Sequence, residues 1–342
     1  MSIVKKKNCT LRDVAGKTGL SVATVSEILN NKPCNYSSEE TRQRVQNTAK
    51  MLGYRTNFGY KLMQGQSTNT VAILISQTYI QSEEYISELI IRLMNKFDQL
   101  DYAVYFKAFT PSAEKNLEQV RELVSRGVEH FVLIGDPLGY LEIEKEIMNK
   151  GLSIVCFGSQ TLTRFVSADI SAGVMTIFRF FLNEGRDFRL VCTLNHLDAN
   201  NTRIVALQRL FPELVFEQIV ERYIITTDAV DFENADFAVN LSKAGWEGTS
   251  RIIKSFPQVN ALCFMNDYMA IGGANFLGRH GFEVGTDMLV AGFNNVQAVK
   301  IYPLPISSVE INMERIVPLL VEESLVNTPC QHIIEPIVHI RK

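Results

Sequence analysis

The sequence predicts two parts: a small all-α head that contains a helix-turn-helix, and a larger α/β body with parallel sheets. Within residues 10–30, two short runs with helical apolar spacing are joined by a glycine. From residue 71 onward, short apolar runs alternate with amphipathic segments, which is typical of parallel strands covered by helices. Residues 1–66 hold eleven lysines and arginines against four acids, a net charge of +7. The rest of the chain therefore carries −10 of the total of −3.

The first two helices of the head are predicted from apolar spacing on either side of Gly19. Thr10 and Asp13 form a start that resembles a capping box, and Ser21 can cap the second helix. The first apolar group is Leu11, Val14 and Ala15, and the second is Val22, Val25, Ile28 and Leu29. An ordinary buried helix pair would show the same spacing.

The charge of the head favours a nucleic-acid interface over an ordinary helix pair, because a basic surface binds phosphates. A helix-turn-helix places the start of its second helix toward base edges in the major groove. The candidate readers are therefore Val22, Ala23, Thr24 and Glu27. Glu27 can accept a hydrogen bond from cytosine N4 but cannot contact guanine O6 or N7.

A third helix is predicted from Ser38, with Thr41 one turn later, to Leu52, where Gly53 stops it. Tyr54 closes the head. Residues 55–67 are polar and contain turn-forming positions, so we expect a linker there.

The body begins with a buried strand at 71–75, after which strands and helices alternate. The further expected strands are 103–106, 130–134, 153–157, 189–193, 222–225, 261–264, 288–291 and 333–340. The expected helices are 83–100, 113–126, 141–150, 172–183, 201–210, 246–255 and 268–280. A chain of 342 residues exceeds one comfortable core, so the body should form one or two lobes.

Ligands of parallel α/β sheets bind at the carboxyl ends of the strands. The polar and aromatic residues expected at that edge are Gln77, Thr78, Tyr79, Asp136, Phe157, Gly158, Asn195, Asn266, Asp267, Asn294 and Asn295.

Composition argues against several classes of protein. No apolar run reaches the roughly 18 residues of a membrane span, and the lysine-rich start is not followed by an export signal. The six cysteines and five histidines are dispersed without metal-ligand or catalytic spacing. We therefore expect a cytoplasmic protein that is not an enzyme and holds no metal or cofactor.

The head, linker and body together resemble the lactose-repressor family of bacterial transcription regulators over essentially the full length. The head carries the resemblance in Thr10-Leu-x-Asp-Val-Ala, Gly19-Leu-Ser, Thr24-Val-Ser-x-Ile-Leu-Asn30, Thr41-Arg42, Leu52-Gly-Tyr54 and Asn57. The body carries it in Phe264-Met-Asn266-Asp267-Tyr-Met-Ala-Ile-Gly272 and Val290-Ala-Gly-Phe-Asn-Asn295.

The resemblance implies a homodimer whose heads bind operator DNA and whose body resembles two-lobed periplasmic binding proteins. The DNA-binding residues that it implies are Thr10, Ser21, Val22, Ala23, Thr24, Ser26, Glu27, Asn30, Ser38, Thr41, Arg42, Tyr54 and Asn57. In the family, the linker becomes a helix that wedges the minor groove. Leu62 is the expected wedge, with Met63 as the second candidate.

The resemblance also implies a small-molecule effector, sugar-like by family, bound between the lobes. The expected effector-binding residues are Tyr79, Phe157, Asp169, Arg203, Trp246, Asn266, Asp267 and Asn294. Trp246 is equally well interpreted as a core residue, and Asp169, Asn266 and Asp267 can cap helices. A sugar acid or a phosphate would also suit Arg203.

The expected boundaries are 1–56 for the head, 57–69 for the hinge linker and 70–342 for the body. Within the body, we expect the first lobe at about 70–166 and 298–324, and the second at about 167–297 and 325–342.

The function that these features favour is a repressor controlled by its effector. Alternatives remain at this stage: an activator of the same architecture, an exported sugar-binding protein or a sugar-processing enzyme. The sequence leaves open the operator, the effector and whether the effector releases or tightens DNA binding.

Overall fold

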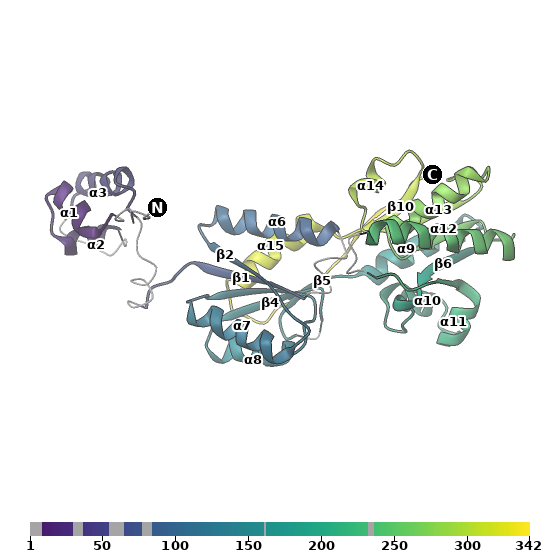
Figure 1. The fold of residues 1–342 in the computed structure, drawn as a ribbon, viewed down its shortest axis with the longest axis horizontal. Coiled ribbons are helices and arrows are strands. Elements are labelled where there is room, and N and C mark those ends of the chain that lie inside the picture. Colours follow the sequence, from purple (N-terminus) through teal and green to yellow (C-terminus); the bar gives the residue numbers. More distant parts are fainter. Residues whose placement is uncertain (1–8, 30–36, 55–64, 77–83, 161, 232–235) are drawn as a thin grey trace, which may run out of the picture. The chain divides into compact units, whose positions relative to one another are not determined.

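The computed structural model describes residues 9–29, 37–54, 65–76, 84–160, 162–231 and 236–342. These residues form two compact units, which divide between Thr68 and Asn69. The helical head and the α/β body agree with the predicted fold class (Figure 1). Asn30, Asn57, Leu62, Met63 and Tyr79, which we expect to bind DNA or effector, lie outside the described residues.

The head consists of α1 (Leu11–Thr18), α2 (Val22–Leu29) and α3 (Glu39–Met51). Its core contains Val14, Ala15, Val25, Ile28, Val45 and Ala49, all buried. Gly19 ends α1 with a φ of 70°, in the left-handed region that glycine adopts without strain. The turn between the two predicted helices is thus built where the sequence places it.

The first lobe of the body is a six-stranded parallel sheet in the order β11-β5-β4-β3-β1-β2. Its strands are β1 (Thr70–Ile75), β2 (Ala103–Ala108), β3 (His130–Ile134), β4 (Ser153–Phe157), β5 (Phe165–Ala168) and β11 (Gln331–Ile334). One face is covered by α6 (Glu84–Gln99) and α15 (Met313–Ser324), and the other by α7 (Ala113–Ser125) and α8 (Tyr140–Asn149) (Figure 1).

The second lobe is a sheet in the order β12-β10-β9-β8-β6-β7. Its strands are β6 (Phe188–Thr193), β7 (Ile224–Thr227), β8 (Ala261–Phe264), β9 (Leu289–Phe293), β10 (Ile306–Glu310) and β12 (Ile337–His339). Its helices are α9 (Ile170–Asn183), α10 (Thr202–Leu210), α11 (Phe216–Tyr223), α12 (Phe237–Ser255), α13 (Asp267–Arg279) and α14 (Gln297–Lys300), with a 3₁₀ turn at Leu194–His196. β12 is antiparallel to β10, an exception to the parallel sheets that we predicted.

Helices α12 and α13 approach each other closely through small residues. A Cβ on Gly272 would lie 1.8 Å from the backbone oxygen of Ser242, and one on Gly245 would lie 1.9 Å from that of Met269. No side chain fits at either position, so these two glycines set the distance between the helices.

The expected crossings between the lobes differ from those in the structure. β10 belongs to the second lobe, whereas we expected residues 298–324 in the first. β11 belongs to the first lobe, whereas we expected residues 325–342 in the second. The apolar pattern of a strand does not say which of two sheets it joins, so the pattern could not decide these assignments.

Three expected elements also have different limits. The predicted strand at 333–340 is two strands in different sheets, because Pro336 cannot donate a ladder hydrogen bond. Residues 222 and 223 end α11 instead of starting a strand. Helix α12 begins at Phe237, nine residues before the predicted start, and Asp236 at its N-cap makes no side-chain capping bond.

Candidate functional sites

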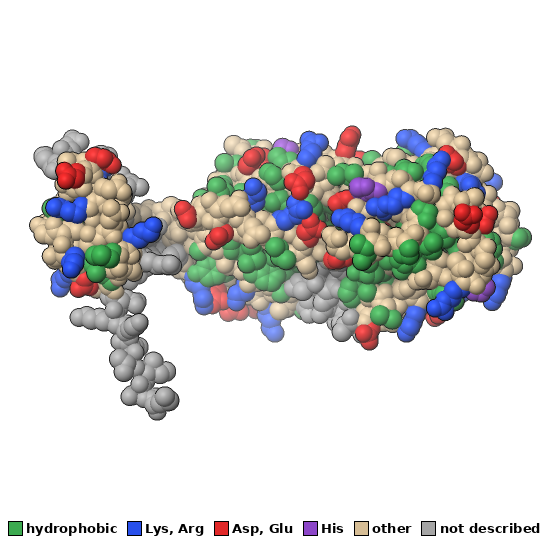
Figure 2. Space-filling view, turned by 90° about the horizontal axis from the view of Figure 1, so that it is seen from above, with side chains coloured by type: hydrophobic (Ala, Val, Ile, Leu, Met, Phe, Trp, Pro, Cys, Tyr) green, Lys and Arg blue, Asp and Glu red, His purple; other side chains and the backbone are tan. Residues whose placement is uncertain are grey.

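The exposed start of α2 is the candidate nucleic-acid surface of the head. Val25 and Ile28 turn inward to the core, whereas Val22, Ala23 and Glu27 are exposed on the opposite side. Val22 is 42% exposed, a high value for an apolar residue in a unit with so small a core. Lysine and arginine side chains are spread over the visible face of the head (Figure 2).

Several of the predicted DNA-binding side chains have a capping role. The Thr10 hydroxyl accepts a hydrogen bond from the Asp13 N–H, and the Asp13 carboxylate accepts one from the Thr10 N–H, which completes the capping box. The Ser21 Oγ accepts from the N–H of Thr24 at 3.1 Å. At α3, the Ser38 Oγ accepts from the Thr41 N–H at 3.3 Å.

The remaining predicted head residues lie on or near these helices. Ser26, Thr24, Thr41, Arg42 and Tyr54 are partly buried. Tyr54 also packs against the head core, and its N–H donates to the Ala49 carbonyl at 2.8 Å. The described head therefore brings the start of α2 and the start of α3 to its surface.

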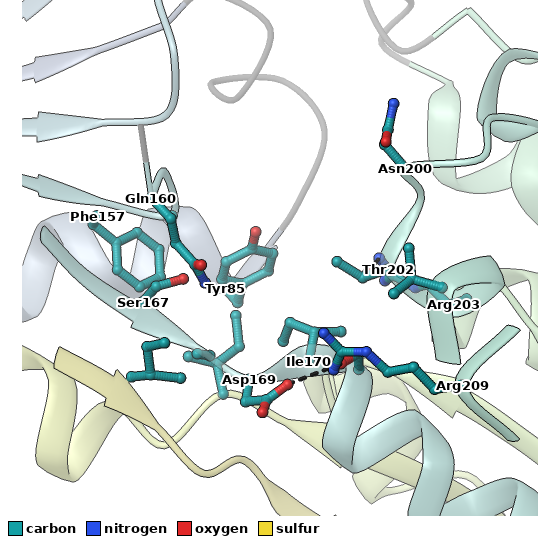
Figure 3. Close-up of a pocket in the computed structure, with 16 residues that line it drawn as sticks. Tyr85, Phe157, Gln160, Ser167, Asp169, Ile170, Asn200, Thr202, Arg203 and Arg209 are labelled. Carbon is teal, nitrogen blue, oxygen red and sulfur yellow. Dashed lines mark hydrogen bonds between the residues drawn. The ribbon is translucent and has the colours of Figure 1, made fainter. Parts of the chain in front are cut away.

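The candidate effector site is a cavity of about 500 Å³ in the body, between the two lobes. It is lined by Tyr85, Phe157, Gly158, Gln160, Ser167, Ala168, Asp169, Ile170, Ser171, Asn200, Thr202, Arg203, Val205, Arg209, Ile311 and Ile333. Tyr85, Phe157 and Gln160 lie on one side, and Thr202, Arg203 and Arg209 on the other (Figure 3). The volume is that of a site for a small organic ligand.

Arg203 lies in the first turn of α10, and its guanidinium stands over the Phe293 ring, 4.7 Å from its centre. Its Nη2 donates to the Met265 carbonyl at 3.1 Å, and its Nη1 donates to the Thr202 hydroxyl at 3.3 Å. The Nε is buried and has no hydrogen-bond partner among the described residues. This side chain is held in place and still has a donor to offer.

Asp169 and Arg209 are linked by a serine at the start of α9. The Asp169 Oδ1 accepts from the Ala172 N–H and from the Ser171 hydroxyl, both at 3.0 Å. Arg209 reaches from α10 toward Asp169 (Figure 3) and donates from Nη1 to the Ser171 Oγ at 2.6 Å. Asp169 thus caps α9 and also lines the cavity, as the sequence allowed.

Asn266 and Asp267 do not line this cavity, although we expected them to bind effector. The Asn266 side chain caps α13 by accepting from the Met269 N–H at 3.0 Å. The Asp267 carboxylate is fully buried, and it accepts from the Ser308 hydroxyl and the Val296 N–H, both at 2.8 Å. Both side chains have structural roles here.

Trp246 and Asn294 also lie away from the cavity. Trp246 packs edge-on against Phe276, under the Arg279 guanidinium, in a surface depression between α12 and α13. Asn294 has a φ of 92° and lines a separate groove with Glu84 and Glu310. Of the effector-binding residues expected from the sequence, the cavity collects Phe157, Asp169 and Arg203.

Burial shifts the ionisation of groups close to Arg203. The pKa of His196 is lowered to about 4, chiefly by burial and then by the positive charge of Arg203. Burial raises the pKa of the Cys192 thiol to about 12. Both groups are therefore neutral at physiological pH, and Cys192 does not supply a thiolate nucleophile.

Comparison with known proteins identifies both parts of the chain. A family model described as bacterial regulatory proteins of the lacI family matches residues 10–57, and one for a periplasmic binding protein-like domain matches residues 180–326. The chain belongs to the LacI family. This LacI-family protein is 23% identical over 304 residues to the HTH-type transcriptional regulator RegA of Clostridium saccharobutylicum, with 88% of this chain and 86% of RegA covered.

Solved structures share the fold of this LacI-family protein. The Lac repressor dimer bound to operator and the anti-inducer ONPF gives a TM-score of 0.75 at 18% identity, over 98% of this chain and 99% of that one. The complex of the regulator CelR with cellobiose gives 0.61 at 18% identity, over 97% and 99%. At these identities, the likeness is one of fold.

The structure adds cavity residues to this LacI-family site that we did not predict. Arg209, Ser171, Tyr85 and Gln160 all line it. A signal was available for two of them: Arg209 lies on the same predicted helix as Arg203, and Ser171 follows the predicted cap Asp169 by two residues. Tyr85 and Gln160 are brought in by the other lobe, and no local pattern marks them.

Within the described part of this LacI-family chain, no group of three or more histidine, cysteine, aspartate or glutamate side chains could hold a metal ion. Among the described helices, none is long and apolar enough to cross a membrane.

Proposed function

We propose that this protein is a transcription repressor that binds operator DNA through the exposed start of α2, as a homodimer. A small molecule, sugar or sugar derivative, binds in the interlobe cavity and controls that binding. The observation that carries the proposal is the pairing of a basic head, whose α2 face is open, with a body that holds a ligand-sized cavity. The names of the relatives, a regulator and a repressor bound to operator, support it.

The head would contribute both parts of DNA recognition. Its net charge of +7 supplies the attraction to phosphates, which weakens as salt is raised. Val22, Ala23 and Glu27 are the side chains that would face base edges. Thr10, Ser21 and Ser38 stand at helix starts, where backbone N–H groups and hydroxyls can meet phosphates.

The body would act through two arrangements of its lobes. A ligand changes the balance between them only if it binds one more tightly than the other. The cavity is suited to this role because its walls come from both lobes, so closure changes the contacts that a ligand makes. The cellobiose complex of CelR supports a sugar as the ligand class.

The experiment that tests DNA binding is fluorescence anisotropy with promoter-derived duplexes from the source genome, repeated from low to high salt. We expect one or a few fragments to bind at nanomolar to micromolar concentrations, with affinity falling as salt rises. Absence of binding by the full chain at low salt would refute the proposal.

A matched pair of variants locates the interface. Ala23→Asp places a carboxylate on the exposed start of α2, so we expect operator affinity to fall at least about tenfold through repulsion of the phosphates. Thr176→Asp adds the same charge at an exposed position of α9 in the body and should leave affinity nearly unchanged. Equal losses in both variants would exclude α2 as the contact surface.

A further inference from the structure

We infer that the ligand of the interlobe cavity is an anionic sugar, a polyhydroxylated ring that carries a carboxylate or phosphate group, and that Arg203 and Arg209 bind its charge. The inference rests on the proposed function, because it specifies the ligand of the same cavity. It adds the sign of the ligand's charge and a second arginine that recognises it.

The cavity has a positive wall inside an acidic body. Its charged lining residues, among those described, are Arg203, Arg209 and Asp169, which sum to +1. The Asp169 carboxylate already accepts two hydrogen bonds, from the Ala172 N–H and the Ser171 hydroxyl. Residues 67–342 as a whole carry a net charge of −10, so the positive cavity opposes the charge of the body around it.

Arg203 has no acidic partner in the described structure. No carboxylate of a described residue lies within 4.0 Å of its guanidinium, and its oxygen acceptors are the neutral Met265 carbonyl and Thr202 hydroxyl. A cation that is partly removed from water is stabilised by a paired anion more than by neutral acceptors. The buried Nε still lacks an acceptor. A ligand anion at the cavity would supply the missing charge.

Arg209 is placed to join Arg203 on the same ligand. Both side chains come from α10 and line the same cavity. The Arg209 contact that the structure gives is Nη1 to the neutral Ser171 Oγ, which leaves the other donors of the guanidinium for a ligand. A guanidinium binds carboxylate and phosphate oxygens with two parallel hydrogen bonds, so two arginines can hold one oxyanion group.

The rest of the cavity fits the ring of a sugar. Hydroxyl and amide groups of Tyr85, Gln160, Asn200 and Thr202 line it and can bond ring hydroxyls, and Phe157 offers an apolar surface. A bare inorganic anion would leave most of the cavity of about 500 Å³ unfilled. The site is therefore built for an anion attached to a larger polar body.

The test is isothermal titration calorimetry of the full-length protein with matched ligands. The panel is glucose and galactose, glucuronate and galacturonate, glucose 6-phosphate and galactose 6-phosphate, and inorganic phosphate alone. We expect at least one acidic sugar to bind, its neutral counterpart to bind at least about tenfold more weakly, and inorganic phosphate to bind weakly. The uronates and the sugar phosphates separate the two sources of the negative charge.

A variant of Arg209 separates charge recognition from folding. Arg209→Gln removes the cation at an exposed position and should weaken the acidic sugar about tenfold, while affinity for its neutral counterpart stays the same. Arg222→Gln removes a cation from exposed α11 of the same lobe and serves as the control. We expect it to leave both affinities unchanged.

Three results would overturn the inference: a neutral sugar that binds as tightly as its acidic counterpart, no binding by any acidic sugar of the panel, or unchanged affinity in Arg209→Gln. Tight binding of inorganic phosphate alone would overturn the sugar part. Operator binding is measured separately by anisotropy. If DNA is bound while these ligand results fail, the anionic ligand is wrong and the regulator stands, whereas loss of DNA binding refutes the proposed function itself.

Discussion

The head and the body bury very different numbers of apolar side chains. Among the described residues, the head core has six buried hydrophobic residues, whereas the core of the second lobe alone has 37. A unit with so small a core has no interior space for a ligand, so its chemistry must lie on its surface. The body has two separate sheets and can leave a cavity between them without exposing either core.

This difference predicts how each part responds to substitution. The body should tolerate the loss of single contacts unless the backbone itself is displaced. The head should lose its fold, and with it DNA binding, when one buried side chain is shortened.

The largest expected effect is that of Gly272→Ala in the body. The new Cβ would lie 1.8 Å from the Ser242 backbone oxygen, so α12 and α13 must separate. We expect the free energy of unfolding of the body to fall by more than about 3 kcal/mol, measured by urea denaturation with circular dichroism.

Gly278→Ala on the same helix is the control, since its Cβ would meet its nearest neighbour at 3.8 Å. It should be neutral, or stabilising by up to about 1 kcal/mol through helix propensity. Equal urea midpoints for the two variants would mean that the helices are not held at this distance.

The next effect is that of Ile28→Ala in the head. Ile28 is 2% exposed, and removing its side chain should cost about 3 kcal/mol. For a core of six residues this is enough to unfold the head, so we expect operator binding to be lost while the thermal transition of the body is unchanged.

Met51→Ala tests whether the effect of Ile28→Ala comes from burial. Met51 is 69% exposed on α3, so its loss should change stability by less than about 0.5 kcal/mol. Retained DNA binding in Ile28→Ala, or a lowered melting temperature of its body, would contradict the independence of the two parts.

The smallest effect is a dependence of body stability on pH. The folded pKa of His196 is about 4, below its usual value near 6.5, so between these values the unfolded chain binds a proton that the folded chain does not. The contribution is therefore complete above pH 6.5 and is lost as the pH falls toward 4, by no more than about 2 kcal/mol. Burial also lowers the pKa of His130, which acts in the same direction.

His196→Gln should remove part of this pH dependence, measured as urea midpoints between pH 7 and pH 4. All five histidines of the chain lie after residue 129, so the head has no histidine to produce such a change. An unaltered slope in the variant would show that His196 does not remain neutral in the fold.

Local patterns were sufficient for the head. The Thr10 and Asp13 capping box, the Ser21 and Ser38 caps and the Gly19 turn all occur where the sequence predicts them. These features depend on residues three or four positions apart, so the printed sequence contains the complete interaction.

The body exceeded what local patterns can say. Pro318 interrupts the apolar pattern of α15, and that helix was not predicted although it packs on the first sheet. β5 and β11 pair across more than 160 residues, a partnership that no short window contains.

The candidate effector site shows the same limit. Arg203 and Asp169 were predicted and line the cavity. Trp246 was offered as an effector residue on its position after Gly245, but its ring packs in a different depression. Tyr85 joins the site from the other lobe, because tertiary packing brings it there.

The order of strands in the two sheets has a consequence for synthesis on the ribosome. β11 and β12 are edge strands of different sheets, and both come from residues 331–339. Neither lobe has its full set of strands until this stretch leaves the exit tunnel, although the head can fold as soon as α3 emerges. Truncation before residue 331 would therefore damage both halves of the sensor at once and leave a nascent head able to occupy DNA without ligand control.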